Sequence, residues 1–180
     1  AQGDYIRCSS PGTVIPGRSD EPDLFVCTLI NRGVEEIMDP ITGLESEPTL
    51  VGALDNIARK DEDYTFRILG IMSFSRINML YGYSNGNDVL KQFSNMIRAV
   101  THEDDRIFRM DGIKFVIACR GKQVDRITGM LELIREEAAS RIKTNGLTVP
   151  LYLAAGVFVK DENFAGTGAS IRNNLVYVLE

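Results

Sequence analysis

The chain has 180 residues, of which 44% are hydrophobic and 25% are charged. This length and composition are typical of one globular domain with its own core, and they exclude a wholly disordered chain. The net charge of −5 argues against a nucleic-acid-binding role, because such proteins need a positive surface to contact phosphates. No apolar run approaches the roughly 18 residues that cross a bilayer, so we expect no direct membrane insertion.

The cysteine pattern also narrows the classes of site. Cys8, Cys27 and Cys119 are an odd number at wide spacing, and His102 is the single histidine of the sequence. This pattern predicts neither a disulfide framework nor a zinc site. Unpaired cysteines fit a reducing compartment, so we expect a cytoplasmic location. The polar run around His102 predicts a solvated loop.

The chain divides into an arm and one folded domain. Residues 1–23 contain three prolines among clustered glycine and serine, which predicts irregular structure. Residues 24–30 form a β-branched and aromatic run typical of a strand, and a charged connector follows over 31–38. We therefore expect an N-terminal arm with one strand and a connector at 1–38, and a single domain at 39–180.

Within the domain, helical and strand patterns alternate. Ser46 is a candidate helix cap with Pro48 in the first turn, and the apolar residues that follow have helical spacing. Asp111-Gly112 predicts a β-hairpin turn, because these residue types accept positive φ angles. Asn85-Gly86-Asn87 predicts a turn, and Gly166-Thr167-Gly168 predicts a loop.

The remaining segments complete the expected order of helix, strand, helix, strand, strand, helix, strand, helix. We predict strands at 65–74, 106–109, 113–119 and 151–159, and helices at 88–100, at 124–142 with an end near Asn145-Gly146, and at 169–179. This order predicts an α/β three-layer sandwich, in which a mixed central sheet containing a β-hairpin has helices on both faces.

Three segments resemble the motifs of one known family. The segment Asp39–Leu44 resembles the entry motif of GGDEF domains, the family of diguanylate cyclases. A second set of residues has the spacing of the family's central motif, namely Phe74, Ile77-Asn78, Gly82, Gly86 and Leu90. Arg109–Phe115 stands in place of the signature Arg-x-Gly-Gly-(Asp/Glu)-Glu-Phe. The resemblance extends from about Met38 to Glu180 and implies a nucleotide-cyclase-like fold.

The resemblance also implies a chemistry that this sequence does not support. The family condenses two GTP molecules into cyclic di-GMP, with acidic residues holding divalent metal against the triphosphate. The corresponding positions here are Gly70, Ile113 and Lys114, whose side chains cannot coordinate Mg²⁺. We therefore expect no catalytic and no metal-binding residues and no resident cofactor, with Mg²⁺ present only if a nucleotide binds.

The nucleotide-binding positions are partly kept. Asn78 matches the family's guanine-contacting asparagine, whereas Asn87 replaces an aspartate and offers one acceptor oxygen instead of two. The turn Ser73-Phe74-Ser75 can lend backbone N–H groups to a phosphate, although Ser75 replaces a lysine. The candidate nucleotide-binding residues are Ser73, Phe74, Ser75, Asn78 and Asn87. The alternative is that Asn78 and Gly82 only shape the turn into the next helix.

Two further positions depart from the family pattern. Glu180 stands where the family has a phosphate-binding lysine and would repel a triphosphate. The family's Arg-x-x-Asp product-inhibition motif reads His102-x-x-Asp105, which lacks the bidentate arginine, so we do not expect tight cyclic di-GMP binding there. Residues 24–38 resemble the last strand of a PAS sensor module that leads into a GGDEF domain.

These observations predict a degenerate, non-catalytic GGDEF domain with a regulatory role in a larger bacterial sensor protein, through weak nucleotide binding or dimerisation. The candidate partners are GTP or a related nucleotide, a second copy of the chain, and an upstream sensor domain. One alternative is a pure protein-interaction module without a ligand. Another is an active diguanylate cyclase whose metal site is rebuilt from other acids, such as Asp88 or Asp111.

Overall fold

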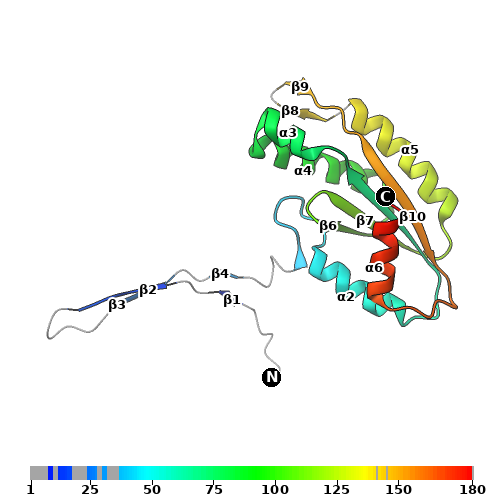
Figure 1. Ribbon diagram of the computed structural model, residues 1–180, viewed down its shortest axis with the longest axis horizontal. Helices are drawn as coiled ribbons and strands as arrows, with labels where there is room; N and C mark the ends of the chain where they lie inside the picture. The colour runs from blue at the N-terminus through cyan, green and yellow to red at the C-terminus, as the bar shows by residue number, and fades with distance from the viewer. Residues whose placement is uncertain are drawn as a thin grey trace.

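The computed structural model describes residues 8–9, 12–17, 24–27, 30–31, 37–140, 142–144 and 146–179. Its centre is a four-stranded sheet in the order β10-β5-β7-β6, with helices on both faces (Figure 1). The strands are β5 (Tyr64–Ile71), β6 (Arg106–Met110), β7 (Lys114–Arg120) and β10 (Leu153–Lys160). Their pairings are antiparallel, and a parallel bridge between Glu45 and Phe108 extends the β6 edge. The α/β sandwich predicted from the sequence is confirmed.

One face of the sheet is covered by α3 (Phe74–Tyr81), α4 (Tyr83–Val100) and α5 (Val124–Ser140). Alternate residues of the central strands, such as Leu69 and Phe115, point into this core. Phe93 of α4 meets Phe115 edge to face, with ring centroids 5.0 Å apart. The apolar spacing that predicted helices at 88–100 and 124–142 therefore marks the side of α4 and α5 that packs on the sheet, whereas α3, which begins where the predicted strand at 65–74 was to end, was not predicted.

The other face is covered by α2 (Glu47–Ala58) and α6 (Gly168–Tyr177), which pack on Phe66, Ile68 and Val116. Helix α2 begins as predicted, because the Ser46 side chain accepts a hydrogen bond from the Thr49 backbone N–H at 3.4 Å. Strand β5 is buried along its whole length, since helices cover both of its faces.

Lys160 and Arg67 are two of the three cations that are buried in the described strands of the sheet, and the third is Arg109. Lys160 is fully buried, and its Nζ donates hydrogen bonds to the backbone carbonyls of Lys60 and Glu62, the latter at 2.8 Å. Arg67 of β5 is 5% exposed, and its Nε has no hydrogen-bond partner among the described residues. Burial and the neighbouring Arg135 lower the pKa of Arg67 to about 10. The charged group of Lys160 is therefore better hydrogen-bonded than that of Arg67.

The predicted turn at Asn85-Gly86-Asn87 is wrong, because these residues lie inside α4. The chain turns earlier, at Gly82, whose φ of +82° ends α3 and starts α4. The Asn85 side chain donates a hydrogen bond to the Tyr81 carbonyl at 2.6 Å and so secures this junction. Residues of types that are common in turns therefore form part of the first turns of helix α4.

The predicted end of the long helix is also wrong. Helix α5 ends at Ser140, and Gly146, with φ of +75°, lies between two short strands that pair with each other. These strands are β8 (Lys143–Thr144) and β9 (Leu147–Thr148). The last helix was expected at 169–179, and in the structure this helix, α6, extends from Gly168 to Tyr177.

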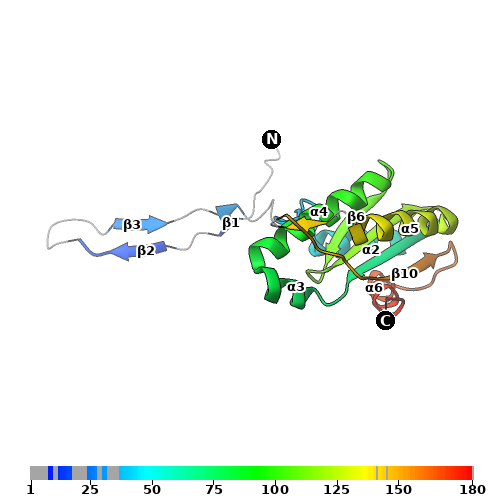
Figure 2. The same cartoon turned by 90° about the horizontal axis from the view of Figure 1, so that it is seen from above.

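The arm contains more strand than the sequence predicted. Its strands are β1 (Cys8–Ser9), β2 (Gly12–Ile15), β3 (Leu24–Cys27) and β4 (Ile30–Asn31). β2 pairs with β3 and β1 pairs with β4, and both ladders lie outside the sandwich (Figure 2). Most of the predicted connector, residues 32–36, lies outside the described residues. Among the helices that the structure describes, none is long and apolar enough to cross a membrane.

Candidate functional site: a remodelled nucleotide pocket

The three positions that the family resemblance assigns to acids meet in one cavity. Gly70 of β5 pairs in register with Lys114 of β7 on one side and with Ala154 of β10 on the other. The cavity beside them has a volume of about 300 Å³. It is lined by Gly70, Ile71, Met72, Ile113, Lys114, Ala154, Val176 and Leu179. The fold therefore places the predicted positions together although they come from separate segments.

The cavity is apolar except for one lysine. Among the residues that the structure describes, no carboxylate lines it, and Val176 and Leu179 near the end of the chain form one wall. A Cβ atom added at Gly70 would lie 3.1 Å from Cδ2 of Leu179, so this leucine occupies the space that a larger side chain at position 70 would need. Lys114 is the charged group, and its Nζ lies 3.0 Å from Oδ2 of Asp111.

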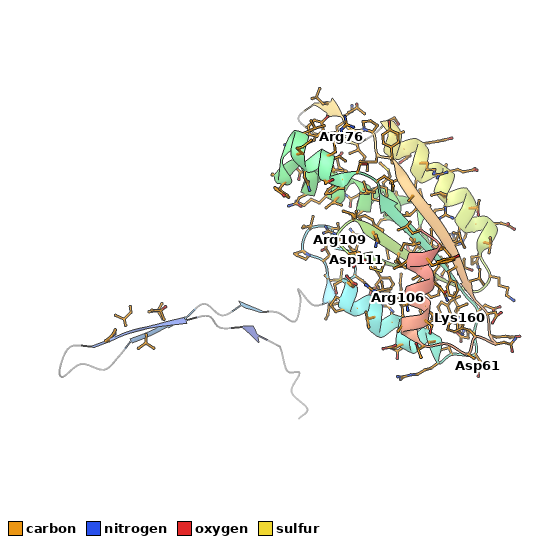
Figure 3. All side chains as sticks on the ribbon, in the orientation of Figure 1. Asp61, Arg76, Arg106, Arg109, Asp111 and Lys160 are labelled. Carbon is orange, nitrogen blue, oxygen red and sulfur yellow. The ribbon has the colours of Figure 1, made fainter. Side chains whose placement is uncertain are left out.

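The acids proposed for a rebuilt metal site do not line this cavity. Asp111, labelled in Figure 3, lies in the β6–β7 turn with a φ of +47°, as the hairpin prediction requires. Its carboxylate contacts Lys114 and Arg172. Arg172 in turn binds Glu47 at 2.7 Å. The Asp88 side chain is 54% exposed on α4. The described residues contain no group of three or more His, Cys, Asp and Glu side chains placed to hold a metal ion.

The candidate nucleotide-binding residues lie on α3 and α4. Ser73 precedes α3 with a φ of +55°, and Ser75 is exposed in its first turn. Phe74 is 7% exposed and packs in the core, so its backbone N–H, and not its ring, is the group available to a ligand. Asn87 is exposed on α4, and Asn78 is half-buried on α3.

Asn78 lies against Gly86 of the neighbouring helix. A Cβ atom added at Gly86 would lie 1.9 Å from Oδ1 of Asn78, so the glycine makes room for this side chain. The same oxygen is buried and has no hydrogen-bond partner among the described residues. Sequence reasoning missed this contact, because it treated Gly86 as a turn residue.

The entry motif and the signature motif are joined by an ion pair. Asp39 accepts hydrogen bonds from Nη1 of Arg109 at 2.7 Å and from the Thr42 hydroxyl at 2.7 Å. Arg109 Nε also donates to the Gly112 carbonyl at 2.8 Å. Burial acts to raise the pKa of Asp39, but hydrogen bonds from Arg109 and Thr42 outweigh it and the pKa is lowered. The pair therefore fixes the hairpin turn to the start of the domain.

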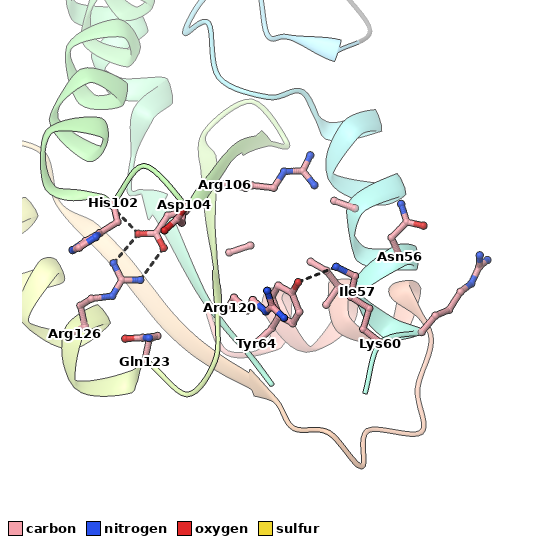
Figure 4. Close-up of a pocket in the computed structure, with 14 residues that line it drawn as sticks. Asn56, Ile57, Lys60, Tyr64, His102, Asp104, Arg106, Arg120, Gln123 and Arg126 are labelled. Atoms are coloured by element: carbon pink, nitrogen blue, oxygen red, sulfur yellow. Dashed lines mark hydrogen bonds and ion pairs between the residues drawn. The ribbon is translucent and has the colours of Figure 1, made fainter. Parts of the chain in front are cut away.

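A larger groove lies at the β6 edge, where the sequence placed the altered product-inhibition motif (Figure 4). Its volume is about 950 Å³, and its lining includes His102, Asp105 and Arg126. Arg126, from the start of α5, forms a bidentate pair with Asp105 at 2.7 and 2.8 Å. Burial acts to raise the pKa of Asp105, but this pair and hydrogen bonds from the Cys119 thiol and the His102 backbone N–H lower it. The Asp105 carboxylate is thus already engaged by the chain itself.

Most of the domain matches a known protein family. The family described as "Diguanylate cyclase, GGDEF domain" matches residues 36–171. This chain belongs to the GGDEF domain family. The match covers the four-stranded sheet, helices α2 to α5 and the positions Gly70, Ile113 and Lys114, so the resemblance inferred from the three motifs is confirmed.

Relatives and solved structures agree with the family. Diguanylate cyclase DgcS of Shewanella oneidensis is 28% identical over 105 residues, covering 56% of this chain and 36% of DgcS. The FimX GGDEF domain of Pseudomonas aeruginosa matches with a TM-score of 0.70 at 19% identity, covering 79% of this chain and 91% of that domain. The GGDEF domain of Caulobacter crescentus DgcB, solved in complex with c-di-GMP, gives 0.70 at 20% identity, with coverages of 79% and 85%. The GGDEF chain thus spans about a third of the length of DgcS.

Proposed function

We propose that this GGDEF domain does not make cyclic di-GMP and acts as a regulatory domain of a larger bacterial signalling protein. The observation that carries the proposal is the cavity where Gly70, Ile113 and Lys114 meet. A divalent metal held against a triphosphate needs several oxygen ligands. The side chains that line this cavity supply a lysine and apolar surface instead.

Two contacts support the same conclusion. Leu179 packs 3.1 Å from the Cβ position of Gly70, close to where a metal-binding side chain at this position would begin. Asp111, the acid within the signature segment Arg109–Phe115, is shared between Lys114 at 3.0 Å and Arg172 at 3.5 Å. Recruiting Asp111 to a metal ion would break both ion pairs.

The proposed regulatory role has two forms. In the first, Asn78 and Asn87 on α3 and α4, with the backbone N–H groups of Phe74 and Ser75, bind GTP or a related nucleotide weakly. These N–H groups lie in the first turn of α3 and therefore have no partner within the helix. In the second, the domain serves only as a contact surface, including contact with a second copy. Met79 and Tyr83, which are 77% and 80% exposed, favour the second form.

The proposal also covers the N-terminal arm and the module to which it connects the domain. We propose that residues 1–38 are the arm through which an upstream sensor module, of PAS type, connects to the GGDEF domain in the cytoplasm. The paired strands β2 and β3 are compatible with the edge of such a module.

The test is a direct assay for product. The protein is incubated for hours with GTP and Mg²⁺ or Mn²⁺, cyclic di-GMP is measured by chromatography, and an active diguanylate cyclase is the positive control. We expect no product from this chain. Product that forms with the wild type and disappears with the Asn78→Ala variant would refute the proposal, because a contaminating enzyme would not respond to that substitution.

A further inference from the structure

We propose that the cavity at Gly70 binds a small molecule with an apolar chain and a single carboxylate, of the size of a medium-chain monocarboxylic acid. The inference rests on the proposed function, since it assigns to the remodelled cavity a ligand other than a nucleotide.

Two small residues lie side by side in the sheet at the floor of the cavity, and Leu179 packs directly over one of them, Gly70. Ala154 and Gly70 are register partners, and Lys114 continues the row on β7. The end of α6 covers this row but leaves about 300 Å³ empty. An apolar cavity of about 150 Å³ binds benzene, so this volume accommodates a chain of about eight carbon atoms.

The walls match an apolar chain. Ile113, Val176 and Leu179 supply branched aliphatic surface around the floor. Met72, which is 52% exposed, adds a flexible thioether side chain at the solvent side. A cavity that is mostly apolar and has one polar group to fix orientation is typical of small-molecule sites.

Lys114 defines the charge of the ligand. Its ammonium group has three donors, and Asp111 accepts one of them at 3.0 Å, so N–H groups are left for a second carboxylate. Asp111 also lies 3.5 Å from Arg172 and keeps that partner when Lys114 is shared. A triphosphate would place several charges against apolar walls with one lysine to balance them, which is unfavourable. An amine would be repelled.

The test uses octanoate as the probe and calorimetry of the whole chain as the readout. Octan-1-ol has the same chain without the charge, and octylamine has the opposite charge. We expect saturable octanoate binding below millimolar Kd, with amide NMR shifts at Gly70, Ile113 and Leu179. The Lys114→Met variant should bind octanoate at least tenfold more weakly and octan-1-ol unchanged. The matched control is Lys122→Met, which changes a 64% exposed lysine away from the cavity and should behave like the wild type.

Three results would overturn the inference: no saturable octanoate binding, equal affinity in the wild type and a folded Lys114→Met variant, or octylamine binding as well as octanoate. Thermal unfolding of each variant verifies that it is folded. The product assay separates this inference from the proposed function. A domain that makes no cyclic di-GMP and binds no octanoate refutes only the present inference, whereas product formation refutes the proposed function and this inference with it.

Discussion

Replacing Gly168 by alanine tests how closely α6 packs on α2, and therefore how firmly the wall of the cavity is held. Gly168 is the first residue of α6, and a Cβ atom there would lie 2.6 Å from the backbone nitrogen of Asp55 and 2.8 Å from the carbonyl carbon of Leu54. Both are backbone atoms of α2 and cannot rotate away. Helix α6 must therefore shift by several tenths of an ångström to reach ordinary contact distances.

The shift disturbs a well-packed interface. Ile171 and Leu175 of α6 are fully buried against Leu50 and Leu54 of α2, and overpacking at such a site costs about 1–3 kcal/mol. For a chain of this length, we expect Gly168→Ala to lower the melting temperature by roughly 2–12 °C.

The control for this prediction is Gly52→Ala. Gly52 is exposed in the middle of α2, and a Cβ atom added there has no neighbour within 4 Å. This substitution should therefore stabilise the protein by up to about 1 kcal/mol through helix propensity. Urea unfolding of both variants and the wild type supplies the free energies. A Gly168→Ala protein as stable as the wild type would refute the close approach of the two helices.

Three further substitutions have distinct expected outcomes. The pKa of Asp105 is lower in the folded protein than its unfolded value near 4, so its pair with Arg126 stabilises above about pH 4 and this contribution is lost as the pH falls below it. Asp105→Asn should therefore lower the free energy of unfolding by about 1–3 kcal/mol at pH 7 and by clearly less at pH 3. Urea unfolding that shows an equal loss at both pH values would contradict this. Lys160→Met removes the donor of two part-buried hydrogen bonds to backbone carbonyls and should cost about 2 kcal/mol by the same measurement. An unchanged stability would mean that the two hydrogen bonds contribute nothing. Arg67→Met removes a poorly satisfied cation beside Arg135 and should leave stability unchanged or raise it by about 1 kcal/mol, so a loss above 1 kcal/mol would show that Arg67 has a favourable partner.

Local signals in the sequence predicted most of the sandwich. The Ser46 cap, the buried run of β5 and the Asp111-Gly112 turn each depend on neighbouring residues, and the structure contains all three. The start of α4 was missed because a tertiary contact, the fit of Asn78 against Gly86, decides between turn and helix. Strands of two residues, such as β8 and β9, have too little sequence for a periodic pattern.

The sequence predicted which positions form the candidate site, but not how the surrounding side chains fill it. Motif spacing aligned Gly70, Ile113 and Lys114 with the acids of the family, and the fold brings them together. The filling of this space by Leu179 could not be predicted, because it depends on how the end of α6 packs on the sheet. The pair between Asp39 and Arg109 joins residues 70 positions apart, a separation at which local patterns carry no information.

The measurement that tests the central claim most directly is the Mg²⁺ dependence of GTP binding, because the claim is that the cavity has lost its metal-binding acids. Calorimetric titrations of the protein with GTP are performed with Mg²⁺ and with EDTA. Since the described side chains that line the cavity at Gly70 include no carboxylate, we expect weak or undetectable binding at millimolar GTP and no gain from Mg²⁺. Micromolar binding that appears only with Mg²⁺ would contradict the account.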